Sequence, residues 1–178
     1  NHDGVIDSND QAPIGYNPVP EMTFSLAAGL NWKGIDFSIL LQGAARSSIY
    51  LQQDIAWDNF WGNYYEEHIG RWTPETAATA TYPRFTKAAT AAHPNYYKSD
   101  YWLKDSKYLR LKNIQLGYTI PRKLLKKFGV RSLRVYANAY NLFTWDNVKK
   151  VDPESSNNSN GQFYPQQKVI NFGINLNF

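Results

Sequence analysis

The segment 168–178 alternates between apolar and polar side chains. Its apolar positions recur at every second residue: Ile170, Phe172, Ile174, Leu176 and Phe178. Asparagine or glycine occupies each position between them. A period of two indicates a β-strand with one apolar and one polar face. Such a strand packs its apolar face on a soluble core, or turns it towards lipid in a membrane barrel, so other segments are needed to choose.

The same alternation predicts four further strands, over 22–32, 35–43, 107–119 and 132–143. In the first, the apolar positions are Phe24, Leu26, Ala28, Leu30 and Trp32. In the segment 132–143, the apolar positions are Leu133, Val135, Ala137 and Ala139, and polar residues occupy the positions between them. The fold class predicted by these patterns is all-β.

Three local signals connect or interrupt these strands. Lys33-Gly34 predicts a tight turn between the first two strands. Within 107–119 the apolar positions change phase, which predicts a β-bulge at Lys112-Asn113. Pro121 ends that strand, and 121–129 is expected to form a turn of helix that ends at Gly129.

The connections between the five strands alternate in length. Short connections at 33–34 and 120–131 alternate with long ones at 44–105 and 144–167. Strands of about ten residues cross a bilayer at a tilt, and short turns on one side with long loops on the other are typical of outer-membrane barrels. We therefore expect an antiparallel transmembrane β-barrel segment whose long loops, 44–105 and 144–167, lie outside the cell.

Five strands do not close a barrel, and open strand edges are not tolerated in lipid. We therefore expect the other strands of the sheet to be supplied from elsewhere. The alternative is a soluble five-stranded sandwich sheet, which needs another element to cover its apolar face.

The long segment 44–105 is rich in aromatic residues. A loop of this length is more than a passive connection, and Gly62 argues against a long helix over 52–68. The residues that would contact a substrate or partner protein are Trp57, Phe60, Trp61, Tyr64, Tyr65, Arg71 and Trp72. The alternative is a loop that packs on itself through its own aromatic side chains.

Composition narrows the class of function. The chain has no cysteine, which excludes disulfides and thiolate metal sites, and aromatic residues make up 16% of it. The net charge of +4 reflects one basic patch in 122–131. A nucleic-acid groove needs basic residues spread along a face, so no nucleic-acid partner is predicted.

The segment 1–10 resembles the later part of a calcium loop. With Gly4 at the sharp turn, the expected oxygen ligands are Asn1, Asp3, the Val5 carbonyl, Asp7 and Asp10. Hard oxygen ligands suit Ca²⁺, whereas Asp10 stands where a bidentate glutamate is usual. The alternative is a turn that binds no metal.

No enzyme is predicted. Glu66 and Glu67 next to His68 diverge on any regular backbone, so they do not converge on one atom. The chain also lacks a phosphate loop, a nucleophile elbow and a pair of histidines at metal-binding spacing.

Short motifs along the chain resemble one known family. In order they are Asp3-Gly4-Val5-Ile6-Asp7, Arg71-Trp72-Thr73-Pro74-Glu75, Tyr82-Pro83-Arg84, Tyr108-Leu109-Arg110-Leu111-Lys112-Asn113, Leu116-Gly117-Tyr118-Thr119-Ile120-Pro121, Val135-Tyr136, Asn141-Leu142-Phe143-Thr144, Asp152-Pro153-Glu154, Tyr164-Pro165 and the terminal Phe178. Together they resemble the C-terminal part of SusC/RagA-type TonB-dependent outer-membrane transporters of the Bacteroidetes.

This resemblance implies a barrel of about 22 strands, closed by a plug domain. This chain would supply the last five strands, while the plug and the earlier strands would lie upstream. The resemblance further implies a SusD-like surface lipoprotein as a lid, energy from TonB, and oligosaccharides or peptides as substrates. The alternatives are a soluble aromatic-rich module that binds carbohydrate or acts as an adhesin, and a self-standing structural β-protein.

The calcium loop gives a first prediction. Replacing Asp3 and Asp7 with alanine should speed proteolysis of the long loops when Ca²⁺ is supplied, because the loop would lose two carboxylate ligands. The measurement is the rate of limited digestion with and without a chelator. If a chelator does not change the rate at which the unmodified chain is digested, calcium binding by this segment is excluded.

Overall fold

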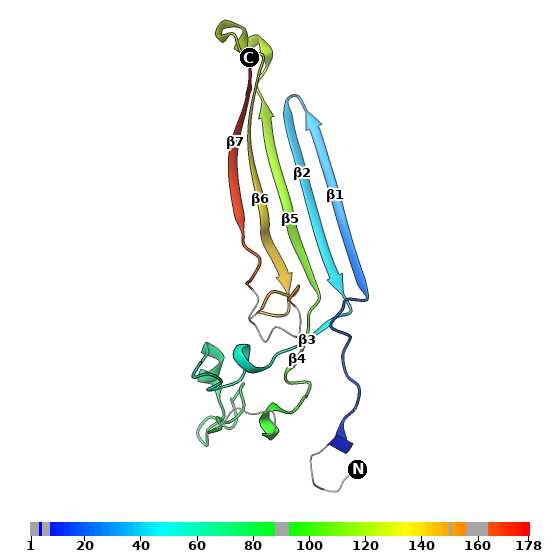
Figure 1. Ribbon diagram of the computed structural model, residues 1–178, viewed down its shortest axis with the longest axis vertical. Helices are drawn as coiled ribbons and strands as arrows, with labels where there is room; N and C mark the ends of the chain where they lie inside the picture. Colours follow the sequence, from blue (N-terminus) through cyan, green and yellow to red (C-terminus); the bar gives the residue numbers. More distant parts are fainter. Residues whose placement is uncertain (1–3, 5–7, 88–92, 150, 156–163) are drawn as a thin grey trace. The chain divides into compact units, whose positions relative to one another are not determined.

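A computed structural model of the chain describes residues 4, 8–87, 93–149, 151–155 and 164–178 (Figure 1). The chain divides into two compact units. The sheet unit comprises Pro20–Arg46, Lys107–Asn147 and Pro165–Phe178. The loop unit comprises Asn1–Val19, Ser47–Ser106 and Val148–Tyr164.

The sheet unit is one antiparallel sheet with strand order β1-β2-β5-β6-β7. Its strands are β1 (Met22–Trp32), β2 (Ile35–Ala45), β5 (Tyr108–Thr119), β6 (Ser132–Asp146) and β7 (Val169–Asn177). This arrangement confirms the predicted all-β antiparallel class. Strands β2 and β6 run two and three residues beyond the predicted ends at 43 and 143.

The predicted turn and bulge are both present. Lys33 and Gly34 have φ values of 47° and 88°, the left-handed pair that a two-residue hairpin turn matched to strand twist requires. In β5, the pairing with β2 and with β6 passes from Leu111 to Asn113 and skips Lys112. The bulge reconciles two apolar runs that are out of phase in sequence.

The connection between β5 and β6 contains helix α1 (Arg122–Leu125) and the 3₁₀ turn η5 (Lys126–Phe128). It ends at Gly129, whose φ of 68° is the left-handed conformation common after a helix. The predicted helical turn after Pro121 is therefore confirmed. None of the helices in the described ranges is long and apolar enough to cross a membrane.

The strand register places the alternating apolar residues of all five strands on one face. Representative members are Leu26, Leu30, Phe37, Ile39, Ile114, Leu116, Val135, Ala137, Phe172 and Ile174. Leu26 is 62% exposed, Leu116 56% and Phe172 82%. Leu116 is on the central strand β5, so its exposure reflects an uncovered face and not a sheet edge. Within the described sheet unit, no second layer covers this face as a soluble sandwich requires.

The loop unit contains short regular elements within the segment 44–105. Strands β3 (Ser48–Tyr50) and β4 (Leu103–Asp105) pair into a second, two-stranded sheet at the two ends of this segment. Between them lie only the 3₁₀ turns η2 (Gln53–Ile55), η3 (Glu66–Gly70) and η4 (Pro94–Tyr96) among the described helices. A further 3₁₀ turn, η1, spans Ser8–Asp10. Strands of three residues are too short to show a periodicity in sequence.

Glycines on the polar face make room for large side chains from neighbouring strands. Gly173 pairs with Tyr136, and a Cβ at Gly173 would overlap the Tyr136 ring. A Cβ at Gly29 would meet only the Phe37 carbonyl oxygen, at 3.6 Å, an ordinary van der Waals distance. The sheet therefore has room for a Cβ at Gly29 but not at Gly173.

Replacing Gly173 with alanine should lower the stability of the sheet by about 1–3 kcal/mol, the usual cost of overpacking, because the Tyr136 ring must move. Gly29→Ala is the matched control, and should be neutral or slightly stabilising because alanine restricts the unfolded chain. The measurement is the temperature at which the folded protein unfolds.

The double variant Gly173→Ala with Tyr136→Ala should recover part of the loss, because the overlapping ring is gone. Equal melting temperatures for Gly173→Ala and Gly29→Ala would show that the Tyr136 ring does not restrict the side chain at position 173.

Candidate functional site

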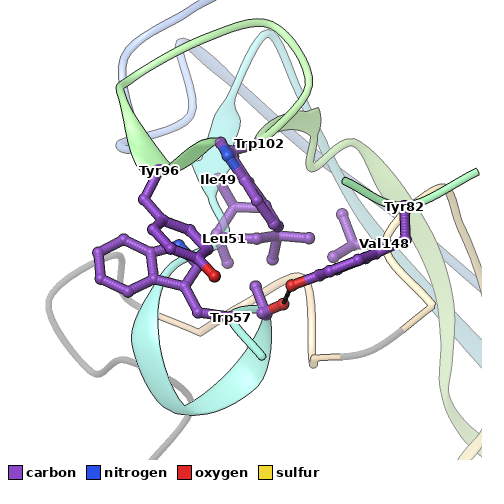
Figure 2. Packing of buried hydrophobic residues seen from close by; sticks show 8 residues of the cluster. Ile49, Leu51, Trp57, Tyr82, Tyr96, Trp102 and Val148 are labelled. Atoms are coloured by element: carbon purple, nitrogen blue, oxygen red, sulfur yellow. Dashed lines mark hydrogen bonds between the residues drawn. The ribbon is translucent and has the colours of Figure 1, made fainter. Parts of the chain in front are cut away.

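The loop unit has a core of its own, built largely from aromatic side chains (Figure 2). Its buried members are Ile49, Leu51, Ala56, Trp57, Tyr82, Tyr96, Trp102 and Val148. The rings meet at inclined angles, as between Trp57 and Tyr96, whose centroids lie 4.7 Å apart. The core explains how a segment with little regular structure stays compact, because its aromatic side chains bury large apolar areas.

A buried carboxylate holds three segments of this core together. Asp58 is 1% exposed, and its Oδ1 accepts hydrogen bonds from the hydroxyls of Tyr82, at 3.4 Å, and Tyr96. Its Oδ2 accepts a bond from the Thr86 backbone N–H at 3.2 Å. These donors satisfy a carboxylate that would otherwise be costly to bury.

Burial raises the pKa of both tyrosine hydroxyls above their usual range, and the nearby Asp58 carboxylate adds to the increase. The single hydroxyl hydrogen of Tyr82 is shared between Asp58 and the Ala56 carbonyl oxygen, which lies closer, at 2.8 Å. Both tyrosines therefore remain neutral donors at physiological pH, which is the state that the Asp58 network requires.

His68 has a structural role. Its Nδ1 accepts a hydrogen bond from the Tyr65 backbone N–H at 3.1 Å, so the ring proton must lie on Nε2. Nε2 lies 3.3 Å from the Ala56 carbonyl oxygen, to which it donates. His68 is 2% exposed, and the neighbouring Glu66 and Glu67 are exposed. With both nitrogens used, this histidine cannot act as a general base without breaking the turn.

The residues predicted to contact a substrate or partner protein differ in their burial. Trp57 is only 3% exposed, which corrects its assignment as a contact residue, because its ring belongs to the core. Phe60 is half-buried and packs edge-on against Trp57 and Trp61, with centroids 5.8 and 5.9 Å away. Those with exposed side chains are Trp61, Tyr64, Tyr65, Arg71 and Trp72. Trp61 is the most exposed of these aromatics, at 84%.

Sequence reasoning missed Ile69, which is 76% exposed in η3. Together with Trp61, Tyr64 and Trp72 it gives the segment 61–72 several exposed apolar side chains that the core does not use. We call these four residues the exposed aromatic segment. A sequence signal for Ile69 was absent, since one isoleucine among polar residues does not reveal its exposure.

The apolar face of the sheet unit has aromatic residues towards both ends. Trp32, Tyr118 and Phe178 lie towards one end, and Phe24, Phe143 and Trp145 towards the other. The stretch of β6 from Val135 to Trp145 measures about 34 Å at ~3.4 Å per residue. At a strand tilt of about 40°, that spans about 26 Å along a bilayer normal, close to the apolar band of an outer-membrane barrel.

The predicted terminal strand signal lies on this apolar face. Phe172, Ile174 and Leu176 of β7 pair with Ala137, Val135 and Leu133 of β6. These three side chains are exposed, as is Phe178.

The opposite, polar face carries an ion pair that sequence reasoning did not identify. Arg134 on β6 donates from Nε to Asp36 on β2 at 2.8 Å, and its second nitrogen also binds this carboxylate. The two side chains cross β5 above Gly117, where any Cβ would overlap them. The available sequence signal was a glycine within a strand, which marks a close approach.

The predicted calcium ligands Asn1, Asp3, Val5 and Asp7 lie outside the described residues. Asp10 is described and lies in the exposed turn η1. Gly4 has a φ of 77°, the left-handed conformation that the sharp turn of a calcium loop needs. Among the described residues, no group of three or more potential metal ligands gathers.

The chain is similar over its length to curated TonB-dependent receptors. It is 30% identical to TonB-dependent receptor P26 of Formosa agariphila, over all of this chain and 19% of that protein. It is 27% identical to TonB-dependent receptor SusC of Bacteroides thetaiotaomicron, over all of this chain and 17% of SusC. The chain thus spans about a fifth of the length of the relatives it matches. No family model matches the chain.

Solved structures share its fold. The RagAB peptide transporter matches with a TM-score of 0.69 and 21% identity, over 97% of this chain and 19% of that one. The RagAB peptide importer in its open-open state matches with a TM-score of 0.67 and 22% identity, over 98% of this chain and 19% of that one. The relatives and solved structures named here are receptors, transporters or importers.

The buried carboxylate gives a prediction for the loop unit. Asp58→Ala should destabilise this unit by about 2–3 kcal/mol, because it leaves buried donors without an acceptor and opens a cavity. The measurement is hydrogen exchange of the backbone amides in Ser47–Ser106, which should speed up while that of β5 and β6 is unchanged.

Asp100→Asn is the control, because Asp100 is an exposed acid of the same unit. Asp58→Asn should fall between the two, since an amide keeps one acceptor but presents a donor to its neighbours. Unchanged exchange in Asp58→Ala would show that the carboxylate does not organise the core.

Proposed function

This chain belongs to the SusC/RagA family of TonB-dependent receptors, and we propose that it forms part of the barrel wall of an outer-membrane importer. The observation that carries the proposal is the five-stranded sheet with an uncovered apolar face and a polar face on its other side. In a barrel, the apolar face contacts lipid and the polar face lines the lumen. The soluble alternatives leave that apolar face without a cover.

The strand register supports a single orientation. It places the short connections 33–34 and 120–131 and the last strand's end at one end of the sheet. The chain leaves the sheet for the loop unit at the other end. We propose that the short connections face the periplasm and that the long connections 44–105 and 144–167 lie outside the cell, following the loop asymmetry of outer-membrane barrels.

The family resemblance supplies the proposed partners. A plug domain and further strands would complete the barrel, TonB would provide energy through the plug, and a SusD-like surface lipoprotein would cover the outer opening. RagAB is described as a peptide importer, which makes peptides one proposed substrate class. Oligosaccharides are the other, since exposed aromatic rings suit sugar faces and apolar peptide side chains alike.

We propose the exposed aromatic segment as the part of the loop unit that contacts substrate or lipoprotein. Trp61 and Ile69 are the most exposed apolar side chains in it. The buried core beneath supports the segment, so binding would need little ordering of the chain. Ca²⁺ at the segment 1–10 is a separate proposal that rests on the spacing of its oxygen ligands.

Replacing both Trp61 and Ile69 with alanine should lower uptake by the intact receptor at least several-fold. The reason is that a few large side chains, which become buried when the partner binds, carry most of the energy of an interface. The measurement is energy-dependent uptake of a panel of labelled peptides and oligosaccharides, with co-purification of surface lipoprotein as a second reading.

The control is Tyr16→Ala, which removes another exposed aromatic side chain of the same unit. Normal uptake by the Trp61/Ile69 variant would exclude this segment as the contact. Uptake that persists after the proton gradient is collapsed would contradict a TonB-driven importer.

A further inference from the structure

The connection between β5 and β6 concentrates positive charge. Its cations are Arg122, Lys123, Lys126, Lys127 and Arg131, and no acidic residue lies among 121–131. All five of these residues are exposed, and α1 and η5 carry four of them. A cluster of one sign costs stability through self-repulsion, and nothing in the folding of so short a connection requires it.

The same connection exposes two large apolar side chains. Leu124 is 65% exposed and Phe128 is 75% exposed. They stand four residues apart, Leu124 in α1 and Phe128 in η5. Leu125 between them is buried and anchors the turn. The connection therefore presents an apolar pair next to cations, the composition of segments that lie in a membrane interface.

The position of the connection in the sheet unit is consistent with a location at a membrane interface. The Arg131 N–H donates to the Asn177 carbonyl at 2.8 Å, and the Ile120 N–H donates to the Leu133 carbonyl at 2.9 Å. These bonds fix the turn at the end of the sheet where Trp32, Tyr118 and Phe178 end the apolar face. Aromatic residues at such an end mark the level of the lipid headgroups.

We propose that the connection 121–131 binds the surface of an anionic phospholipid leaflet. Leu124 and Phe128 enter the boundary between headgroups and acyl chains, while the cations contact phosphate groups. The inference rests on the proposed membrane location of the sheet and adds a lipid partner to it. Charge complementarity and continuity with the apolar face favour lipid over an acidic protein, which becomes an alternative outcome of the test.

The test uses single cysteines in the intact receptor, in a background with no other reactive cysteine. Leu124→Cys and Phe128→Cys are labelled with an environment-sensitive dye, and the receptor is placed in vesicles. The vesicles contain phosphatidylcholine alone or an equal mixture with phosphatidylglycerol, each with quenching brominated lipid. Phe172→Cys on the apolar face is the lipid reference, and Thr79→Cys in the loop unit is the aqueous reference.

Brominated lipid should quench the dye at Leu124→Cys and Phe128→Cys, as it quenches Phe172→Cys, and more strongly when phosphatidylglycerol is present. If Phe172→Cys is quenched and the two positions in the connection are not, the proposal that the connection binds lipid is wrong, while the proposed membrane location of the sheet stands. If the two dyes are shielded from water without quenching, a protein covers the turn and the proposal is overturned. If Phe172→Cys is not quenched, the proposed membrane location itself fails.

A charge variant tests the cations separately. Lys126→Gln with Lys127→Gln should lower the ratio of phosphatidylglycerol to phosphatidylcholine retained by the receptor, by up to roughly five-fold for each cation. Lys87→Gln with Lys98→Gln, which removes two exposed lysines of the loop unit, is the matched control. The ratio is measured by native mass spectrometry after extraction from the mixed vesicles. If both double variants retain the same ratio of phosphatidylglycerol to phosphatidylcholine, the cations of the connection do not contribute to lipid binding.

Discussion

The alternation of apolar and polar side chains along five hydrogen-bonded strands is the constraint on which the sheet unit depends. Pairing satisfies the backbone polar groups between strands, and the period of two then sends every second side chain to each face. The register shifts once, at the β5 bulge, and this shift brings the two apolar runs of β5 onto the same face, so five separate alternating patterns become one apolar surface. A slip of one residue in any strand would turn its apolar side chains to the polar face.

The two faces are maintained by different interactions. On the polar face, glycines admit the Asp36–Arg134 ion pair and the Tyr136 ring between strands. On the apolar face, large side chains such as Leu26, Leu116 and Phe172 are exposed, and aromatic residues gather near its ends. The β5 bulge at Lys112 keeps β5 in phase with both neighbours along its whole length. These features make the sheet suited to a boundary between lipid and an aqueous lumen.

Much of the sheet unit could be predicted from the sequence, because its elements have strong local signals. The alternating runs, the Lys33-Gly34 turn and the phase change at Lys112 each depend on neighbouring residues. The loop unit could not be predicted in this way. Its core joins residues as distant as Ile49, Tyr96 and Val148, and aromatic composition alone does not separate the buried Trp57 from the exposed Trp61. The carboxylate of Asp58 likewise finds its donors only after folding.

We propose that the apolar side chains of this sheet face lipid. It is tested most directly on the middle strand, with spin labels at Leu116→Cys and Gln115→Cys in the intact receptor reconstituted in a bilayer. We expect the label at position 116 to be accessible to oxygen dissolved in lipid, and the label at position 115 to be accessible to a water-soluble relaxing agent. Equal accessibility at the two positions, or a label at position 116 shielded from both agents, would contradict a lipid-facing sheet.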